Sequence, residues 1–309
     1  MTADPLVRRW RPARPLDLPA VLGPLRRGPG DPTFRYVPGA GVWRATRTPD
    51  GPATTAIRVD VALGVVEARA WGPGAAWSVE SAPDLVGESD DPTGFVPGHP
   101  VLREAWRRHP GWRVPRSGQV LEALVPAVLE QKVTGREAWR GFRSLVWRYG
   151  EPAPGPVDQV PGGLRVPPSG RTWAGVPSWE WHRAGVDQSR SRTVVTAARS
   201  SGRLETLAGL DPAEASGRLR SLPGVGVWTA AEVAQRALGD ADAVSVGDYH
   251  LSSLVGQALV GEPVDDDAML QLLEPYRGHR YRAVRLVELS GVRPERHGPR
   301  YAGRDYRAM

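Results

Sequence analysis

The period of the hydrophobic pattern changes part-way along the chain. Between residues 33 and 79 apolar and polar residues alternate in the segments GVWRATRT, AIRVDV and GVVEARAW, and the turn PDGP separates the first two. Alternation punctuated by Pro-Asp-Gly predicts antiparallel strands joined as hairpins. From Leu102 onward apolar residues recur every three or four positions, which is the spacing of amphipathic helices. A sheet followed by helices predicts an α+β fold.

Helical spacing is clearest on either side of Gly135. Two sets of apolar residues each share a helical face: Leu121, Leu124, Val125, Val128 and Leu129, then Trp139, Phe142, Val146 and Trp147. Residues 80–100 are rich in turn formers, and the Pro/Gly-rich segment 151–170 is expected to form a long surface loop. We therefore divide the chain into an N-terminal antiparallel sheet domain (1–98), a helical core (99–292) and a basic tail (293–309).

The composition limits the chemistry that the chain can use. Its net charge of +6 and isoelectric point near 10.1 favour a polyanionic partner. The absence of cysteine excludes disulfides, thiolate zinc sites, cysteine nucleophiles and an all-cysteine iron–sulfur cluster. No signal peptide begins the sequence and no run of eighteen apolar residues interrupts it, so we expect a soluble intracellular protein that does not enter a membrane.

The string LPGVGVWTA at 222–230 contains a Gly-x-Gly turn that has two interpretations. A dinucleotide-binding fold would need a buried strand ending at Gly224 and an acidic residue about twenty positions on, and Asp248 follows Gly226 by 22 residues. The preceding DPAEASGRLRSLP, however, has polar residues at helical spacing. A helix–hairpin–helix over about 213–238 fits better, because the amides that open its second helix can face a DNA phosphate.

The same string resembles a known family. LPGVGVWTA followed by SVGDYHL is similar to the signature of the helix–hairpin–helix DNA glycosylase superfamily, and within it most similar to bacterial 3-methyladenine-DNA glycosylase II. Three more segments resemble that family in order: WRPARPLDLPAVLGPLRRG, ALVPAVLEQKVTGREA and EPYRGHRYRAVRLVELSG. The resemblance implies base excision repair: removal of alkylated purines such as 3-methyladenine from damaged double-stranded DNA, after the nucleotide has been extruded from the duplex.

The resemblance also assigns roles to residues. Asp248 matches the catalytic aspartate, whose carboxylate stabilises the positive charge on the sugar as the glycosidic bond breaks; the alternative is a helix N-cap. Trp228 stands where strand-cleaving members carry a Schiff-base lysine. The resemblance therefore implies a monofunctional glycosylase without lyase activity, with Trp228 and Tyr249 in the base pocket. A core tryptophan that packs the hairpin is the alternative for Trp228.

The DNA contacts implied by the resemblance come from two turns. Gln131 and Lys132 match the turn that fills the gap left by the flipped nucleotide, although the family carries an apolar wedge where Lys132 stands. Lys132 is the one lysine among 40 basic residues, and a solvated lysine at a helix end is the alternative. The remaining predicted DNA-binding residues are Thr134, Gly224, Val225, Gly226 and Thr229.

No cofactor is implied beyond a monovalent cation, sodium or potassium, at the hairpin. Its matching ligands are the backbone carbonyls of Arg220, Leu222 and Val225, and the six histidines show no metal-ligand spacing. We expect a cytoplasmic, nucleoid-associated monomer. Two rival functions stay open: a non-catalytic DNA-structure or lesion-binding protein of the same fold, and a nicotinamide-dependent oxidoreductase.

Overall fold

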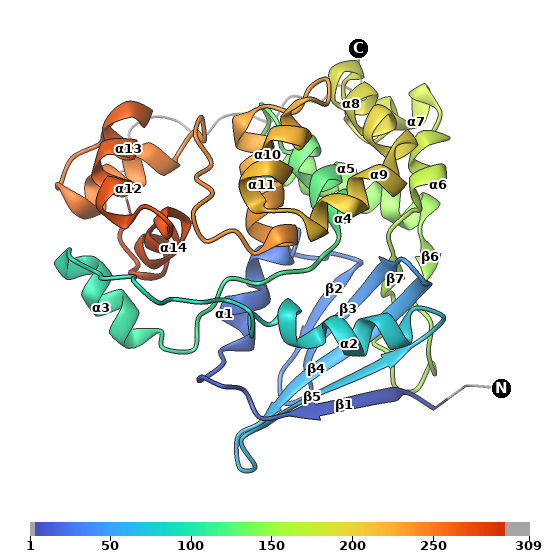
Figure 1. Cartoon of the computed structure of the whole chain (residues 1–309). Helices are drawn as coiled ribbons and strands as arrows, with labels where there is room; N and C mark the ends of the chain where they lie inside the picture. Colours follow the sequence, from blue (N-terminus) through green and yellow to red (C-terminus); the bar gives the residue numbers. More distant parts are fainter. Residues whose placement is uncertain (1–3, 294–309) are drawn as a thin grey trace.

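The computed structural model describes residues 4–293 (Figure 1). Its N-terminal part is a five-stranded antiparallel sheet in the order β1-β5-β4-β3-β2. The strands are β1 (Leu6–Trp10), β2 (Phe34–Val37), β3 (Gly41–Thr48), β4 (Gly51–Asp60) and β5 (Val65–Trp71). The predicted hairpins are confirmed: β3 pairs with β4 up to Thr48 opposite Gly51, and β4 pairs with β5. Most of the predicted tail, residues 294–309, lies outside the described residues.

One face of the sheet is covered by two helices. Helix α1 (Leu18–Leu22) and helix α2 (Ala75–Leu85) bury their apolar residues against Val42, Ile57 and Val66. The expectation that residues 80–100 are turns is therefore wrong for residues 80–85, which form the second half of α2. Pro83 makes the sequence look like a turn, but it lies in the last turn of the helix, where its missing N–H removes only one backbone hydrogen bond.

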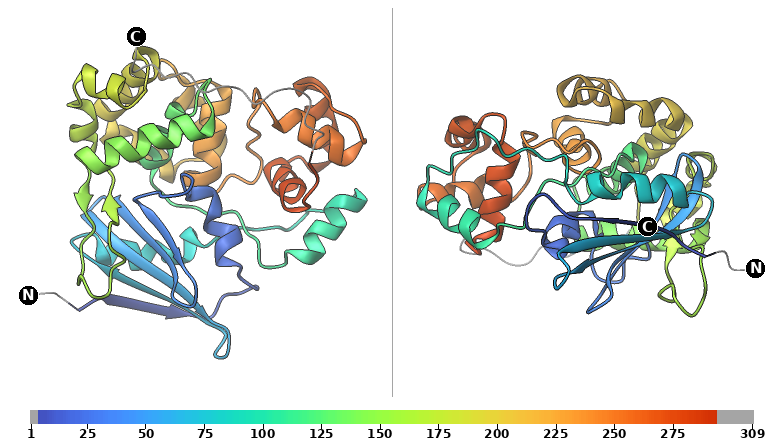
Figure 2. Two further views of the ribbon diagram at one scale, coloured as in Figure 1. Left: turned by 180° about the vertical axis from the view of Figure 1, so that it is seen from behind. Right: turned by 60° about the horizontal axis from the view of Figure 1, so that its bottom comes forward.

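The other face of the sheet is covered by the Pro/Gly-rich segment. It forms two short paired strands, β6 (Glu151–Pro152) and β7 (Arg165–Val166), and the views in Figure 2 show it against the sheet. Val160 and Leu164 are buried over the stacked rings of Trp43 and Trp71, whose centroids are 5.5 Å apart. The segment is irregular and largely exposed, as expected of a surface loop, but the few apolar residues between its prolines and glycines shield this tryptophan pair from water.

The rest of the described chain is helical, and the α+β prediction is confirmed. The first group of helices comprises α4 (Val120–Leu129), α5 (Gly135–Tyr149), α6 (Gly170–Ala174), α7 (Ser178–Arg183), α8 (Gln188–Arg199), α9 (Ser201–Glu205), α10 (Pro212–Arg220) and α11 (Val227–Val233). The second comprises α3 (Pro100–Arg108), α12 (Leu251–Leu259), α13 (Asp266–Leu273) and α14 (Arg280–Leu289). Each group has a buried apolar cluster of its own.

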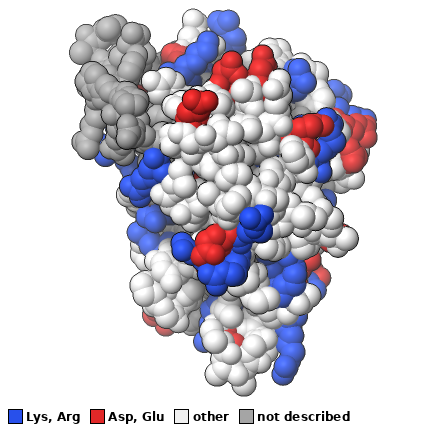
Figure 3. All heavy atoms as spheres, turned by 90° about the vertical axis from the view of Figure 1, so that its left-hand side faces the viewer, with Lys and Arg blue, Asp and Glu red and all other residues white. Residues whose placement is uncertain are grey.

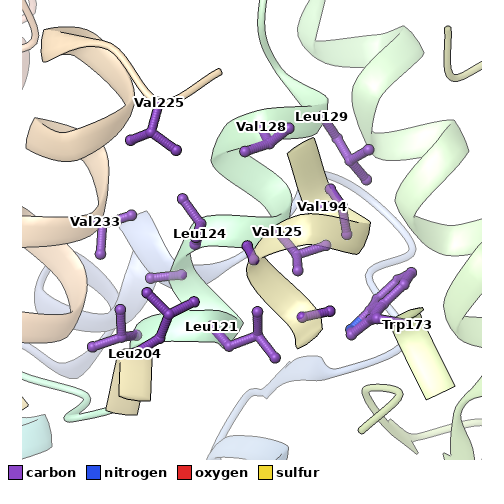
Figure 4. Packing of buried hydrophobic residues seen from close by; sticks show 14 of the residues in the cluster. Leu121, Leu124, Val125, Val128, Leu129, Trp173, Val194, Leu204, Val225 and Val233 are labelled. Atoms are coloured by element: carbon purple, nitrogen blue, oxygen red, sulfur yellow. The ribbon is translucent and has the colours of Figure 1, made fainter. Parts of the chain in front are cut away.

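Helix α4 lies at the centre of the first group. Every residue of α4 except Glu122 is buried, so its contacts extend all round the helix rather than along the single face that the sequence predicts. Figure 4 shows Leu124, Val125 and Val128 of α4 among side chains from α8, α9 and the hairpin, which include Val194, Leu204 and Val233. This packing fixes the hairpin against the centre of the molecule.

Candidate active site

The Gly-x-Gly turn connects two helices. Helix α10 ends at Arg220, the turn follows, and α11 begins at Val227 with Gly226 as its N-cap. No side chain caps α11, so the amides of its first turn are free of side-chain partners. Because a helix and not a strand leads into Gly224, the geometry that a dinucleotide site requires is not found here, and the helix–hairpin–helix interpretation holds.

The two glycines of the turn are not equivalent. Gly224 has a φ of +85°, and a Cβ at this position would lie 2.0 Å from Oγ1 of Thr193. Gly226 has an ordinary φ of −94°, and a Cβ there would meet nothing within 4 Å. Gly224 is therefore required by the turn itself, whereas Gly226 leaves open space in front of the amides of α11.

The turn between α4 and α5 is bound to the hairpin. Nε2 of Gln131 donates to the carbonyl oxygen of Gly224 at 2.9 Å and to Oγ1 of Thr229 at 2.8 Å. Lys132 is exposed, and within residues 4–293 it is the one non-glycine residue with a positive φ, at 56°. Thr134 is the N-cap of α5 in a capping box with Glu137. The side chains of Gln131, Thr229 and Thr134 thus make contacts within the protein, and Lys132 is the exposed residue of the α4–α5 turn.

Asp248 makes the contacts of a helix cap and leaves its second oxygen beside Trp228, so the catalytic role stays a prediction that capping does not exclude. Its Oδ1 accepts hydrogen bonds from the backbone N–H groups of His250 at 2.9 Å and Leu251 at 3.1 Å, which fixes the start of α12. Its Oδ2 accepts from Nε1 of Trp228 at 3.2 Å. The structure therefore brings the predicted carboxylate and the predicted pocket wall into direct contact, and a capping contact holds the carboxylate in position.

The two predicted aromatic residues of the pocket have different surroundings. Trp228 is half-buried and is not among the buried residues of the core around α4, so the structure does not support the core-tryptophan alternative. Because its hydrogen bond to Asp248 uses the ring edge, the ring faces are not occupied by this contact. Tyr249 is 89% exposed, with its ring edge-to-face against His250 at 4.8 Å, and does not line the cavity beside Asp248.

That cavity has a volume of about 170 Å³. Besides Asp248, its charged and phenolic lining residues are Glu232, Arg236, Tyr281, Arg285 and Glu288. The motifs in the sequence do not predict these residues. One signal is present, since Glu232 follows Trp228 by four residues and residues four apart share a helix face. Burial raises the pKa of Tyr281, so its hydroxyl stays protonated at neutral pH.

A polar network joins α11 to the loop that precedes Asp248. Helix α11 continues into a π-helical turn, Ala234–Leu238, which carries Gln235 and Arg236. Nε2 of Gln235 donates to the carbonyl of Ala243 and to Oγ of Ser245, both at 2.9 Å. The Ser245 hydroxyl donates to Oε1 of Glu232 at 2.6 Å, and Arg236 pairs with Oε2 at 2.8 Å. This network fixes the distance between α11 and the Asp248 loop.

With this geometry described, comparisons with known proteins identify the relationship. No family model matches the sequence. The chain is 37% identical over 155 residues to the probable bifunctional transcriptional activator/DNA repair enzyme AlkA of Mycobacterium tuberculosis. The aligned segment covers 49% of this chain and 30% of the relative. Over this segment the chain is homologous to AlkA. The matched segment spans less than a third of the length of that relative.

Solved structures extend the likeness to nearly the whole fold. The 3-methyladenine DNA glycosylase of Archaeoglobus fulgidus superposes with a TM-score of 0.73 at 17% identity, covering 92% of this chain and 98% of that one. The 8-oxoguanine glycosylase/lyase of Clostridium acetobutylicum, solved with double-stranded DNA, gives a TM-score of 0.69 at 10% identity, covering 94% and 96%. The AlkA-homologous chain thus has the fold of the helix–hairpin–helix DNA glycosylases, and at these identities only the fold is shared.

The predicted cation ligands are carbonyls at the end of α10 and in the turn. The carbonyl of Leu222 already accepts the N–H of Val225 at 3.0 Å and keeps one lone pair for a cation. Arg220 is the last residue of α10, where carbonyls lack partners within the helix. The donor set fits a monovalent cation, which stays a prediction. Among residues 4–293 no three His, Cys, Asp or Glu residues gather into a metal site.

The surface on the side of α3 and α12–α14 carries both basic and acidic side chains. On the side of α3 and α12–α14, Figure 3 shows basic and acidic atoms next to one another with uncharged surface between them. Glu104 pairs there with Arg107 and Arg108, and Glu274 pairs with Arg277. The net charge of the chain therefore does not by itself place a polyanion on this side. In the described part of the chain no helix is long and apolar enough to span a membrane.

Proposed function

We propose that this protein is a monofunctional DNA N-glycosylase that excises alkylated purines from double-stranded DNA and leaves an abasic site. The contact between Asp248 and Trp228 beside the cavity carries the proposal. Asp248 lines the cavity, a space into which an extruded base could enter, and Trp228, which is not among the lining residues, places an aromatic ring for the base directly against that carboxylate. Homology to a segment of AlkA, a probable DNA repair enzyme, supports the repair chemistry.

Asp248 is suited to stabilise a cation. Its three hydrogen-bond partners are N–H groups without charge, and no salt bridge to Asp248 occurs among the described residues. The carboxylate therefore keeps its negative charge for the sugar, on which positive charge develops as the glycosidic bond lengthens. At an effective dielectric constant near 20, an ion pair at about 4 Å contributes roughly 4 kcal/mol. That corresponds to about a thousandfold in rate.

Trp228 supports both the substrate class and the absence of strand cleavage. An indole face stacked on a cationic alkylated purine contributes up to about 2 kcal/mol when desolvated. An indole cannot form the Schiff base that a lyase needs. The sequence holds a single lysine, Lys132, and it lies at the tip of the α4–α5 turn rather than in the lining of the cavity.

Double-stranded DNA is the proposed partner, held at two places. The uncapped amides at the start of α11 would bind a phosphate across the open space at Gly226. Lys132 projects at the tip of a turn that Gln131 fastens to the hairpin, so a wedge and a phosphate grip would act as one rigid unit. The strained backbone of Lys132 agrees with a functional position. We expect a monomer located with the nucleoid in the cytoplasm.

The test is a panel of duplexes that each carry one modified base: 3-methyladenine, 7-methylguanine, hypoxanthine, uracil or 8-oxoguanine. Free base released in a single turnover is measured by chromatography. The proposal expects release of methylated purines. Binding of the duplexes without release of any base would favour the rival, a non-catalytic DNA-structure or lesion-binding protein of this fold. The lysine at the wedge position, where the family carries an apolar residue, is the observation that favours this rival. Release of only uracil or 8-oxoguanine would overturn the substrate class.

A further inference from the structure

Residues 24–31 lie between α1 and β2, and they contact both parts of the proposed site. Pro24 is among the residues that line the cavity. Arg27 pairs with Glu130, the residue that caps the end of α4 two positions before Lys132. A segment of the sheet domain therefore touches the cavity at one point and the α4–α5 turn at another.

The contact with the α4–α5 turn is made by a buried arginine, Arg27. Oε1 of Glu130 accepts a hydrogen bond from Nε1 of Trp139 at 3.2 Å and pairs with Nη1 of Arg27 at 3.6 Å. The backbone next to Arg27 packs on the same indole so closely that a Cβ at Gly28 would lie 2.2 Å from Cε3 of Trp139. Glu130 is thus held between α5 and residues 24–31, and the turn that carries Lys132 starts from this fixed point.

The contact with the cavity is made through Arg236. Its Nε donates to the carbonyl oxygen of Pro24 at 3.0 Å, and its Nη1 pairs with Glu232 at 2.8 Å. Glu232 accepts from the hydroxyl of Ser245 at 2.6 Å, and the carbonyl of Ser245 accepts from the amide of Asp248 at 3.2 Å. Residues 24–31 are therefore connected to the backbone of Asp248 through a continuous series of contacts.

The two contacts are also connected by charge. Burial lowers the pKa of the Arg27 guanidinium, and the charge of Glu130 opposes this effect. Arg236 lowers the same pKa and Glu232 raises it. The four groups therefore interact as one cluster of two positive and two negative charges. Removal of one partner from a buried cluster leaves an uncompensated charge, so the contacts on the turn side and on the cavity side depend on each other.

We propose that Arg27 is a positioning residue that holds the turn with Lys132 at a fixed place relative to the Asp248 cavity, so that the wedge enters the gap while the extruded base enters the cavity. Arg27 is buried and does not line that cavity, so it acts through Glu130 and the turn. This inference rests on the proposed glycosylase function and gives the sheet domain a part in base extrusion. A misplacement of about 1 Å by a change far from the chemistry costs up to about 100-fold in rate.

The experiment uses the double variant Arg27→Met with Glu130→Gln. It removes both charges of the pair together, so no unpaired charge is left buried, and the glutamine oxygen still accepts from Trp139. Single-turnover excision of 7-methylguanine is compared at a paired and at a mismatched position. Excision from the paired position should slow by about 10- to 100-fold. At the mismatched position, where unstacking costs less, it should stay within about threefold of the wild type.

A matched control removes a different buried ion pair. Arg113 and Glu88 have side-chain exposures of 1% and 17%, close to the 7% and 17% of Arg27 and Glu130, and neither lines the cavity. Arg113→Met with Glu88→Gln should lower the melting temperature but leave the ratio of the paired and mismatched rates unchanged. If Arg27→Met with Glu130→Gln does not fold, Glu130→Gln alone should change that ratio in the same direction by at least about threefold.

Two further measurements connect the effect to the wedge. Adding Lys132→Ala to the double variant should slow excision from the paired position little further, because both changes act on the same step. Base extrusion is followed separately by the fluorescence of a 2-aminopurine next to the lesion, which rises when the base stack opens. The wild type should raise this fluorescence at the paired position, and the double variant should raise it less.

The possible outcomes separate this inference from the glycosylase proposal. Equal slowing at both positions, a ratio no different from that of the control, fully additive slowing by Lys132→Ala, or an unchanged fluorescence rise would each overturn the positioning role and leave the glycosylase proposal standing. A wild type that opens the base stack but releases no base, with the opening lost in the double variant, would overturn the glycosylase proposal and support the positioning role. Absence of both opening and release in the wild type would overturn both.

Discussion

Asp248→Asn separates the capping role of this residue from its proposed catalytic role. The asparagine oxygen can still accept from the amides of His250 and Leu251, so the start of α12 should persist. Its NH₂ group replaces Oδ2, however, and cannot accept from Nε1 of Trp228. The substitution therefore removes one hydrogen bond as well as the charge, and should lower the free energy of unfolding by about 1 to 2 kcal/mol.

The catalytic role predicts a much larger effect on rate. Removal of the charge withdraws stabilisation from the cationic sugar only as the glycosidic bond breaks, so it acts on the transition state. Excision should fall by roughly two to four powers of ten, which corresponds to about 3 to 5 kcal/mol. Binding to a duplex with an uncharged abasic analogue should change little, because phosphate contacts dominate affinity. The assay is single-turnover excision beside a binding titration at fixed salt and a thermal melt.

Trp228→Phe supplies the matched control for the lost hydrogen bond. It removes the indole N–H and keeps an aromatic face, so combining it with Asp248→Asn relieves the clash of two donors. The double variant should recover stability relative to Asp248→Asn alone but should not recover excision. Excision within tenfold of wild type in a folded Asp248→Asn protein would refute the assignment of this carboxylate to catalysis.

Three further predictions concern the hairpin, the wedge and the sheet. Gly226→Ala should fold normally and weaken binding to damaged and undamaged duplex alike by about tenfold. Gly224→Ala should also lower the melting temperature, because Gly224 has a φ of +85° and an added Cβ would collide with Thr193. Normal duplex binding by Gly226→Ala would show that the hairpin does not contact DNA. Lys132→Ala should slow excision from paired duplex more than from mismatched or single-stranded substrate, where unstacking costs less, and equal slowing would indicate plain phosphate attraction. Burial would raise the pKa of the Glu67 carboxyl, but hydrogen bonds from three arginine side chains outweigh it and hold that pKa at about 2. The stability that Glu67 contributes is complete above about pH 4.5 and is lost as the pH falls towards 2. Between these pH values, the free energy of unfolding measured with urea should therefore fall by about 1 to 2 kcal/mol less in Glu67→Gln than in the wild type. The same pH dependence in both proteins would contradict this.

The sequence predicts the parts of the fold whose pattern is local. The alternation in β3, β4 and β5 and the three- and four-residue spacing of α4 and α5 each repeat over several residues, so the type of element follows directly. Helix α2 and the segment around Val160 escape prediction because prolines interrupt them. These two segments are positioned by packing against the two faces of the sheet, and such long-range contacts leave no local pattern in the sequence.

The candidate site divides in the same way. Gly224, Trp228 and Asp248 lie in short distinctive strings, and the structure brings Trp228 and Asp248 into contact. Arg285 and Glu288 lie on α14, an ordinary amphipathic helix in the sequence, and become part of the site only because α14 packs against the Asp248 loop. Residues whose role depends on a neighbour far along the chain give no local signal.

The central claim is base excision without strand cleavage, and one duplex that carries a single 7-methylguanine tests it most directly. After incubation with the wild-type protein, one half of the sample is run on a denaturing gel at neutral pH and the other half after hot alkali. A parallel reaction contains borohydride to trap any Schiff base. The account predicts an intact strand at neutral pH, cleavage at the lesion only after alkali, and no trapped protein–DNA adduct. A strand already cut at neutral pH together with a trapped adduct, or a strand that resists alkali, would contradict it.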